Sequence, residues 1–329
     1  LKTLRDPAPA AYPPSHVLGD TGNKDMPIAL RGNLRKPGPI APRRFLQLLA
    51  GPDAKAFTVG SGRLGLAEAM VAPSNPLTPK VFVNRVWAWH FGRGLVRSPS
   101  NFGTLGQKPT HPDLLEWLAA DFVEHGWSIK RLHRTILLSA TYRQSSAFNK
   151  KAFAADGDNR LVWRFNPRRL DVESWRDSLL AVTGEIDLNL GGAPTEDVRG
   201  SRRRTMYFKV SRTGDRFSTD VFLRLFDFPI PRATIAKRPL STVPQQYLFL
   251  LNSPIMIDRA RGLVARLKKE APDPSARIER AYQLLYGRSP TPLESRLAHD
   301  FLDGEPASKA TATTGKRDDV LISDFEGGN

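Results

Sequence analysis

Cysteine is absent from all 329 residues of the chain. This absence excludes disulfide bridges, thiolate nucleophiles, zinc–thiolate sites, iron–sulfur clusters and covalently attached haem c within the chain. Long apolar runs are absent too, because none approaches the roughly 20 residues that a membrane-spanning helix needs. The chain also has no glycine-rich phosphate loop, Gly-x-Ser-x-Gly nucleophile elbow or dinucleotide-binding fingerprint. We therefore expect no cofactor within this chain and no transmembrane span.

Basic residues, in contrast, are plentiful: 49 Lys and Arg face 33 Asp and Glu, which gives a formal net charge of +16. Arginine is the more frequent of the two and is the better residue for bidentate contacts to carboxylate, phosphate or sulfate. Two interpretations follow, a basic surface with internal ion pairs or an anionic partner. An acidic or sulfated polysaccharide fits the charge, whereas nucleic acid is least favoured because no recognition motif is present.

Apolar residues recur at helical spacing through most of the chain, which predicts a mainly α protein with a few short strands. We expect a Pro- and Gly-rich extended arm over 1–66, a single helical domain over 67–303, and a linker with the truncated start of a further module over 304–329. Expected helices cover 45–49, 64–71, 78–90, 112–125, 129–140, 172–182, 244–251, 254–269, 276–286 and 292–302. Expected strands cover 161–165 and 204–210.

The segment His90-Phe91-Gly92-Arg93-Gly94 follows the expected helix over 78–90. The glycines permit a positive φ and close backbone approach. His90 and Arg93 either complement the dipole at the end of the helix or, in the alternative, form a site in which Arg93 holds an anion. Arg143 and Arg169 are further candidates for anion binding.

The segment Thr110-His111-Pro112-Asp113 opens the next expected helix. One interpretation is a helix cap, with Asp113 in the first turn. The other makes His111 a general base, because imidazole titrates near neutral pH, with Asp113 as the acid. A metal site built from His90, His111 and Asp113 is less favoured, and we expect no metal.

Two further groups of acids lie in the second half of the chain. Glu173 and Asp177 share a helix face, so they form either an acid/base pair or an ion-paired surface. Asp227 lies in a segment with many cations, and it either fixes a loop through an ion pair or supplies a site acid. These alternatives stay open at the level of sequence.

Several long blocks, in a fixed order over about residues 75–300, closely resemble the planctomycete domain of unknown function 1553, often labelled as cytochrome-associated. The blocks are NRVWAWHFGRGLV, PTHPDLLEWLA, LHRTILLSATYRQSS, NPRRLDVESWRDSLLAVTG, FDFP, STVPQQYLFLLNSP and AYQLLYGRSPTPLE. The chain departs from the family at Ile230-Pro231, where many members have Asp-Pro after the preceding proline. This departure weakens any essential role for a second acid at that place.

The resemblance implies an exported, periplasmic or cell-surface protein of several modules. Members commonly carry an N-terminal c-type cytochrome module, so haem c would belong to a part outside this chain. Some carry a lectin-like β-sandwich, which the end of the segment over 304–329 resembles. Genes for sulfatase-like exported proteins often lie nearby, which makes such proteins expected partners. The family brings no established reaction or catalytic residues.

Two functions follow from these observations. The first is a scaffold or binding module of an exported, cytochrome-linked protein that contacts an anionic polysaccharide or a partner protein. The second is an enzyme acting on sulfated or acidic polysaccharide, with His111 as base, Asp113 or Asp227 as acid, and Arg93, Arg143 and Arg169 binding the anion. Convergence of these residues in one pocket would favour the enzyme.

Overall fold

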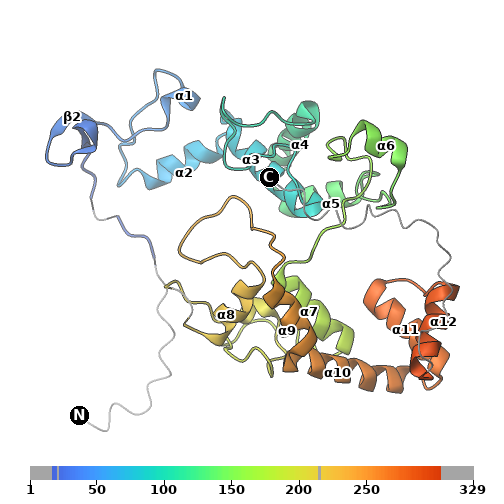
Figure 1. Ribbon diagram of the computed structural model, residues 1–329. Coiled ribbons are helices and arrows are strands. Elements are labelled where there is room, and N and C mark those ends of the chain that lie inside the picture. The colour runs from blue at the N-terminus through green and yellow to red at the C-terminus, as the bar shows by residue number, and fades with distance from the viewer. Residues whose placement is uncertain (1–16, 21, 214–215, 305–329) are drawn as a thin grey trace, which may run out of the picture. The chain divides into compact units, whose positions relative to one another are not determined.

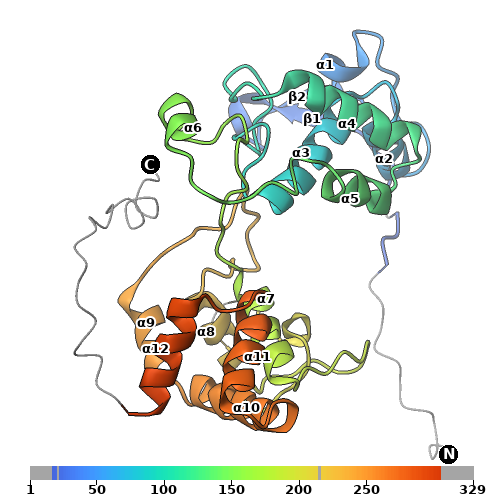
Figure 2. The same cartoon turned by 90° about the vertical axis from the view of Figure 1, so that its right-hand side faces the viewer.

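The computed structural model describes residues 17–304 except 21 and 214–215. Contacts divide the chain into an N-terminal unit that ends at Arg168 and a C-terminal unit that begins at Arg169. Both units are built mainly of helices (Figure 1, Figure 2), and the described residues contain one two-stranded sheet. The prediction of a mainly α protein is therefore confirmed. The sequence predicted one domain over 67–303, whereas the contacts form two units across this range.

The described part of the expected arm contains a β-hairpin that the sequence did not predict. Strands β1 (Met26–Ala29) and β2 (Pro37–Ala41) pair antiparallel, with Met26 opposite Ala41 and a register shift near the turn. The 3₁₀ helix η1 (Leu30–Gly32) lies in the connection, and the single turn α1 (Gln47–Ala50) follows. Neither strand contains a buried residue, so the hairpin lies outside the apolar core.

The N-terminal unit has its core where three helices meet, with α3 packed against both α4 and α5. Val83 and Val86 are 0% exposed and contact a cluster that includes Leu118, Leu132 and Ile136. Because these residues recur three or four positions apart, each helix turns one apolar stripe inward. The helices of this unit are α2 (Arg63–Val71), α3 (Leu77–Phe91), α4 (Pro112–Glu124), α5 (Ile129–Leu137) and α6 (Lys150–Ala155).

The C-terminal unit has a smaller apolar core made of Val172, Phe208, Phe222 and Leu223, with partly buried aromatic rings around it. Helix α7 packs against α10, and α10 in turn contacts α9 and α11. The helices of this unit are α7 (Val172–Thr183), η2 (Thr205–Tyr207), α8 (Ser218–Leu225), α9 (Pro244–Asn252), α10 (Pro254–Glu270), α11 (Pro274–Tyr286) and α12 (Pro292–Leu302).

Both strands expected in the middle of the chain were wrong. Residues 161–165 form an irregular loop in which Val162 has φ +55°, a value that a strand does not contain. Residues 204–210 form η2 and an isolated bridge from Phe208 to Thr195, because the amide of Thr205 is bound by the carboxylate of Asp177 instead of a neighbouring strand. Helix α6 was not predicted.

Two further expectations concern membranes and the chain ends. Along the described part of the chain, no helix is both long and apolar enough to cross a membrane. The expected linker and truncated module over 304–329 lie, apart from residue 304, outside the described residues, as does the beginning of the arm. The predicted boundaries of these segments stay predictions.

Candidate functional site

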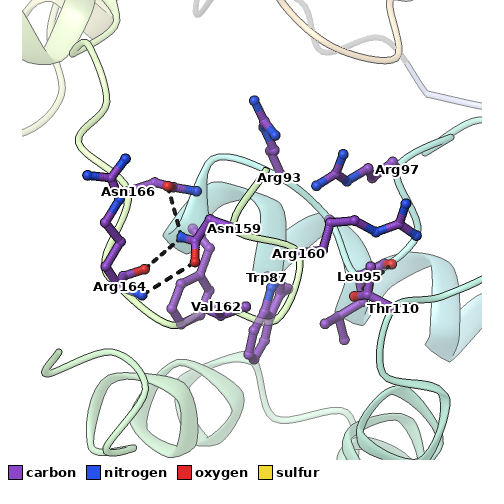
Figure 3. Close-up of a pocket in the computed structure, with 12 residues that line it drawn as sticks. Trp87, Arg93, Leu95, Arg97, Thr110, Asn159, Arg160, Val162, Arg164 and Asn166 are labelled. Atoms are coloured by element: carbon purple, nitrogen blue, oxygen red, sulfur yellow. Dashed lines mark hydrogen bonds between the residues drawn. The ribbon is translucent and has the colours of Figure 1, made fainter. Parts of the chain in front are cut away.

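A cavity of about 30 Å³ lies in the N-terminal unit, where the end of α3 and the loop after it meet the loop that follows α6 (Figure 3). This volume holds about one or two water molecules, so a small polar group is the natural occupant. Its lining consists of Trp87, Phe91, Arg93, Gly94, Leu95, Arg97, Thr110, Asn159, Arg160, Val162, Arg164 and Asn166.

The loop after α3 is held in place by a buried asparagine. Asn84, 1% exposed, donates from Nδ2 to the carbonyl of Val96 at 3.0 Å and accepts from its amide at 2.8 Å. Gly92 ends α3 with φ +79°, and a Cβ on Gly94 would lie only 2.7 Å from the Asn84 amide group. The expected positive φ and the expected close backbone approach are therefore both confirmed. The two glycines fix the backbone on either side of Arg93.

The loop after α6 is organised around a second buried asparagine, Asn159, at 7% exposure. Its Nδ2 donates to the carbonyl of Arg164 at 2.8 Å and to Oδ1 of Asn166 at 2.9 Å (Figure 3). Asn159 and Val162 both have positive φ, of 48° and 55°. A β-branched residue rarely adopts this conformation, so the surrounding contacts hold the loop in a strained shape.

Four arginines surround the cavity. Arg93 and Arg160 are exposed, Arg97 and Arg164 are half-buried, and Figure 3 shows Arg164 on the side opposite Arg97 and Arg160. The guanidinium group of Arg164 stacks on the ring of Trp163, at 4.9 Å from its centroid. No described Asp, Glu or His lines the cavity, so its charged lining is entirely cationic.

An acidic residue lies beside the cavity without lining it. Arg97 Nη1 is 3.1 Å from Asp158 Oδ2, and its Nη2 donates to the Asp158 carbonyl at 3.4 Å. Arg93 Nη1 donates to the same carbonyl at 3.3 Å. Two guanidinium groups thus converge on one residue. Such planar donor groups recognise oxyanions, so the arrangement is suited to bind an anionic group and not to move a proton.

His111 and Asp113 lie close to this cavity along the chain but do not line it. His111 occupies the N-cap position of α4 without a capping side-chain bond, and its Nδ1 lies 3.0 Å from Oγ1 of Thr110. Asp113 is exposed in the first turn of α4, where a negative charge complements the helix dipole. Their expected roles as base and acid stay predictions.

Asp227 and Arg169 belong to the C-terminal unit and contact each other. Asp227 has φ +65°, and its carboxylate accepts from the amide and hydroxyl of Ser241 at 2.9 and 2.5 Å. Arg169 lies 3.8 Å from the same carboxylate and donates to the carbonyl of Ser241. The contacts are those of a loop-fixing ion pair. Arg143, exposed in the turn after α5, is a separate position in the N-terminal unit.

Glu173 and Asp177 line a groove of about 300 Å³ along α7. Arg238 binds both oxygens of Glu173 at 2.7 Å, while Arg204 and the amide and hydroxyl of Thr205 bind Asp177. Each carboxylate therefore has its own cationic partner. The contacts agree with the ion-paired interpretation of this helix face.

A pair of histidines was not predicted. His90 at the end of α3 places Nε2 2.8 Å from Nδ1 of His133 on α5, with the ring of Tyr142 edge-on to His90 at 5.6 Å. Burial, the nearby His133 and the cation of Arg168 lower the pKa of His90, in that order of importance. The two residues are 43 positions apart, so only the packing of α3 on α5 reveals the pair.

The expectation of no metal concerns the same side chains. His90 contacts His133, whereas His111 contacts Thr110, so the contacts of the two histidines do not join them. Within residues 17–304, apart from those left undescribed, no three His, Asp or Glu side chains are placed to hold a metal ion.

The sequence of the chain places it in a known family. The sequence profile of one family, described as PSD1, protein of unknown function (DUF1553), matches residues 62–302. The chain belongs to this DUF1553 family. No curated protein and no solved structure matches it. The DUF1553 match covers the cavity, the histidine pair and both apolar cores, and it begins one residue before α2.

Proposed function

We propose that this DUF1553 domain is a binding module that holds an anionic group of a polysaccharide, outside the cytoplasm, at the cavity lined by Arg93, Arg97, Arg160 and Arg164. The observation that carries the proposal is that Arg93 and Arg97 converge on one residue, Asp158, at the edge of a small cavity whose described lining contains four arginines and no acid. Sulfate ester and uronate groups both offer the planar or bidentate acceptor geometry that guanidinium groups bind.

The backbone around the cavity supports binding over a purely structural role for these arginines. Asn84 and Asn159 fix the two loops from the protein interior, while the side chains of Arg93 and Arg160 are exposed. The backbone that carries these arginines is therefore ordered in advance and loses little freedom when a ligand arrives. The Arg97–Asp158 ion pair is the weaker type, because the Asp158 side chain is 66% exposed.

Fewer structural observations support the alternative function, an enzyme that acts on sulfated or acidic polysaccharide. Hydrolysis of a glycosidic bond normally needs two carboxyl groups that flank it. The two acids beside this cavity are already engaged, because Asp158 pairs with Arg97 and the Asp156 carboxylate accepts from the backbone amides of Arg160 and Leu161. Both oxygens of Asp227 are bound within the C-terminal unit. A protein partner, including a sulfatase-like exported protein, would use the same cationic surface through its acidic residues.

The test is direct binding. We expect the protein to bind a heparin-derived or polygalacturonate oligosaccharide in isothermal titration calorimetry, with weaker binding at higher salt and none to a neutral dextran oligosaccharide. The double variant Arg93→Ala/Arg97→Ala should lose affinity by about tenfold or more, because charge-assisted hydrogen bonds contribute about 1.5–3 kcal/mol each.

Two controls separate a specific site from general basicity. Arg134→Ala removes one positive charge, half of what the double variant removes, from the exposed surface of α5 and should change affinity by less than about twofold. Arg93→Lys/Arg97→Lys keeps the charge but removes the planar forks, so it should bind more weakly than the wild type. No binding by the wild type at low salt, or equal losses in the Arg134 and Arg93/Arg97 variants, would reject the proposal.

A further inference from the structure

The arginines that would hold the ligand already hold an acid of the chain. Arg97 contacts both the carboxylate and the carbonyl of Asp158, and Arg93 contacts the carbonyl. The carboxylate therefore lies where Arg97, at the edge of the cavity, presents its donors, with Arg93 bound to the backbone of the same residue. Asp158 is also next to Asn159, the buried residue that fixes the loop, so its backbone position is determined independently of the ion pair.

The carboxylate of Asp158 is held loosely compared with the backbone beside it. Its side chain is 66% exposed, whereas the Arg97 side chain is 22% exposed, and the ion pair is its one contact with a side chain among the described residues. An exposed ion pair of this kind contributes little to stability. The carboxylate is thus free to move into solvent when a stronger anion arrives, without disturbing the loop.

Resting on the proposed function, we infer that Asp158 is an internal competitor that occupies the arginine site until an external anionic group displaces it. An external anion then binds only if it interacts with the guanidinium groups more strongly than the Asp158 carboxylate does. Single carboxylates and chloride, which grip the guanidinium groups no better than Asp158 does, are disfavoured. A sulfate ester has three terminal oxygens, enough to accept from Arg93 and Arg97 together, so sulfated polysaccharide is the class of ligand that the site favours.

Competition of this type has a quantitative signature. When only a fraction of the protein has a free site, the apparent affinity of every ligand is reduced by that same fraction. Asp158→Asn removes the competing charge and should raise the affinity for heparin-derived and polygalacturonate oligosaccharides by one common factor, about two- to sixfold, the range that follows from an exposed ion pair. The preference for the sulfated ligand should persist.

The experiment compares the wild type, Asp158→Asn, Asp158→Ala and the matched control Glu124→Gln, which removes one negative charge at the exposed end of α4. Both Asp158 variants should gain affinity equally, and Glu124→Gln should change it by less than about twofold. Thermal melting and hydrogen exchange of residues 156–166 check that the loop stays folded. Asp158→Ala keeps the test valid if the asparagine variant is disturbed.

The outcomes separate this inference from the proposal on which it rests. If neither the wild type nor the Asp158 variants bind any anionic oligosaccharide, the proposed function is wrong. If the wild type binds and Arg93→Ala/Arg97→Ala does not, but the Asp158 variants gain nothing, Asp158 is no competitor. An equal gain in Glu124→Gln would assign the effect to overall charge, and unequal gains for the two ligands would contradict displacement of one shared occupant.

Discussion

The two units use arginine in different ways. In the N-terminal unit the core is apolar, centred on Val83, Val86 and Leu132, and the arginines that line the cavity are exposed or half-buried at its edge. In the C-terminal unit Arg176 and Arg259 are themselves buried, at 3% and 5% exposure, beside a much smaller apolar core. The excess of positive charge therefore includes both structural and surface arginines, and a net charge alone does not identify a ligand.

Arg176 shows the structural use most clearly. Its guanidinium group donates to the carbonyls of Ser201 and Arg203 at 2.6 and 3.0 Å and lies 4.4 Å from the centroid of the Phe208 ring. Burial lowers its pKa to about 10, which still leaves the group charged at neutral pH. One side chain from α7 thus supplies hydrogen bonds to the backbone carbonyls of Ser201 and Arg203, which lie in an irregular segment.

The largest expected effect comes from removing this side chain. Arg176→Ala leaves the partly buried carbonyls of Ser201 and Arg203 without this donor, so the free energy of unfolding of the C-terminal unit should fall by about 3–5 kcal/mol. Urea denaturation gives the loss, and hydrogen exchange locates it in α7 and residues 198–205. Arg176→Lys, which keeps the charge but not the fork, should be intermediate. A loss of less than about 1 kcal/mol would contradict a structural role for Arg176.

The matching change in the N-terminal unit is Leu132→Ala. Leu132 is 2% exposed in the apolar core, so the truncation should cost about 2–4 kcal/mol through lost burial and the remaining cavity. Leu138, at 64% exposure just after α5, is the control, and Leu138→Ala should change stability by less than about 0.5 kcal/mol. Similar losses in both variants would mean that α5 is not packed as described.

The smallest effect concerns pH. The pKa of His90 is lowered in the folded protein, so between that value and the ordinary 6.5 the unfolded chain binds more protons. The free energy of unfolding of the N-terminal unit should therefore be highest above pH 6.5 and should fall as the pH drops below 6.5. His133, Tyr142 and Arg168 are the groups that face His90.

Hydrogen exchange of each unit at pH 7.5 and pH 5.5 measures this decline. His90→Gln should flatten the response of the N-terminal unit. The C-terminal unit, whose one described histidine is His299, serves as the internal reference. An unchanged pH response in His90→Gln would show that the histidine pair does not cause the sensitivity.

Helix positions were predictable because the termination and capping signals are local. Ser128, Asp171 and Ser253 each accept a hydrogen bond from a backbone amide at the start of α5, α7 and α10. Gly92 and Gly184 end α3 and α7 with positive φ. These interactions span only a few residues, so their pattern is visible in the sequence itself.

The candidate site was predictable only in part. Arg93 was identified because its flanking glycines mark a helix end, but Arg97, Arg160 and Arg164 gave no local signal. The cavity joins segments about 60 residues apart, which only the packing of α3, α4 and the following loops brings together. The failed strand over 161–165 has the same origin, since the hydrogen bonds of Asn159 override the β propensity of Val162.

The hairpin of β1 and β2 has a further consequence. No described residue before Gly62 is buried, and exposed ion pairs help to hold this segment, such as Asp25 with Arg43 at 2.8 Å inside it and Asp20 with Arg63 of α2 at 3.2 Å. Dissolved ions screen exposed contacts of this kind, whereas they leave buried apolar packing intact. A rise in ionic strength should therefore weaken these ion pairs of the N-terminal segment, while the apolar packing of α3, α4 and α5 stays in place.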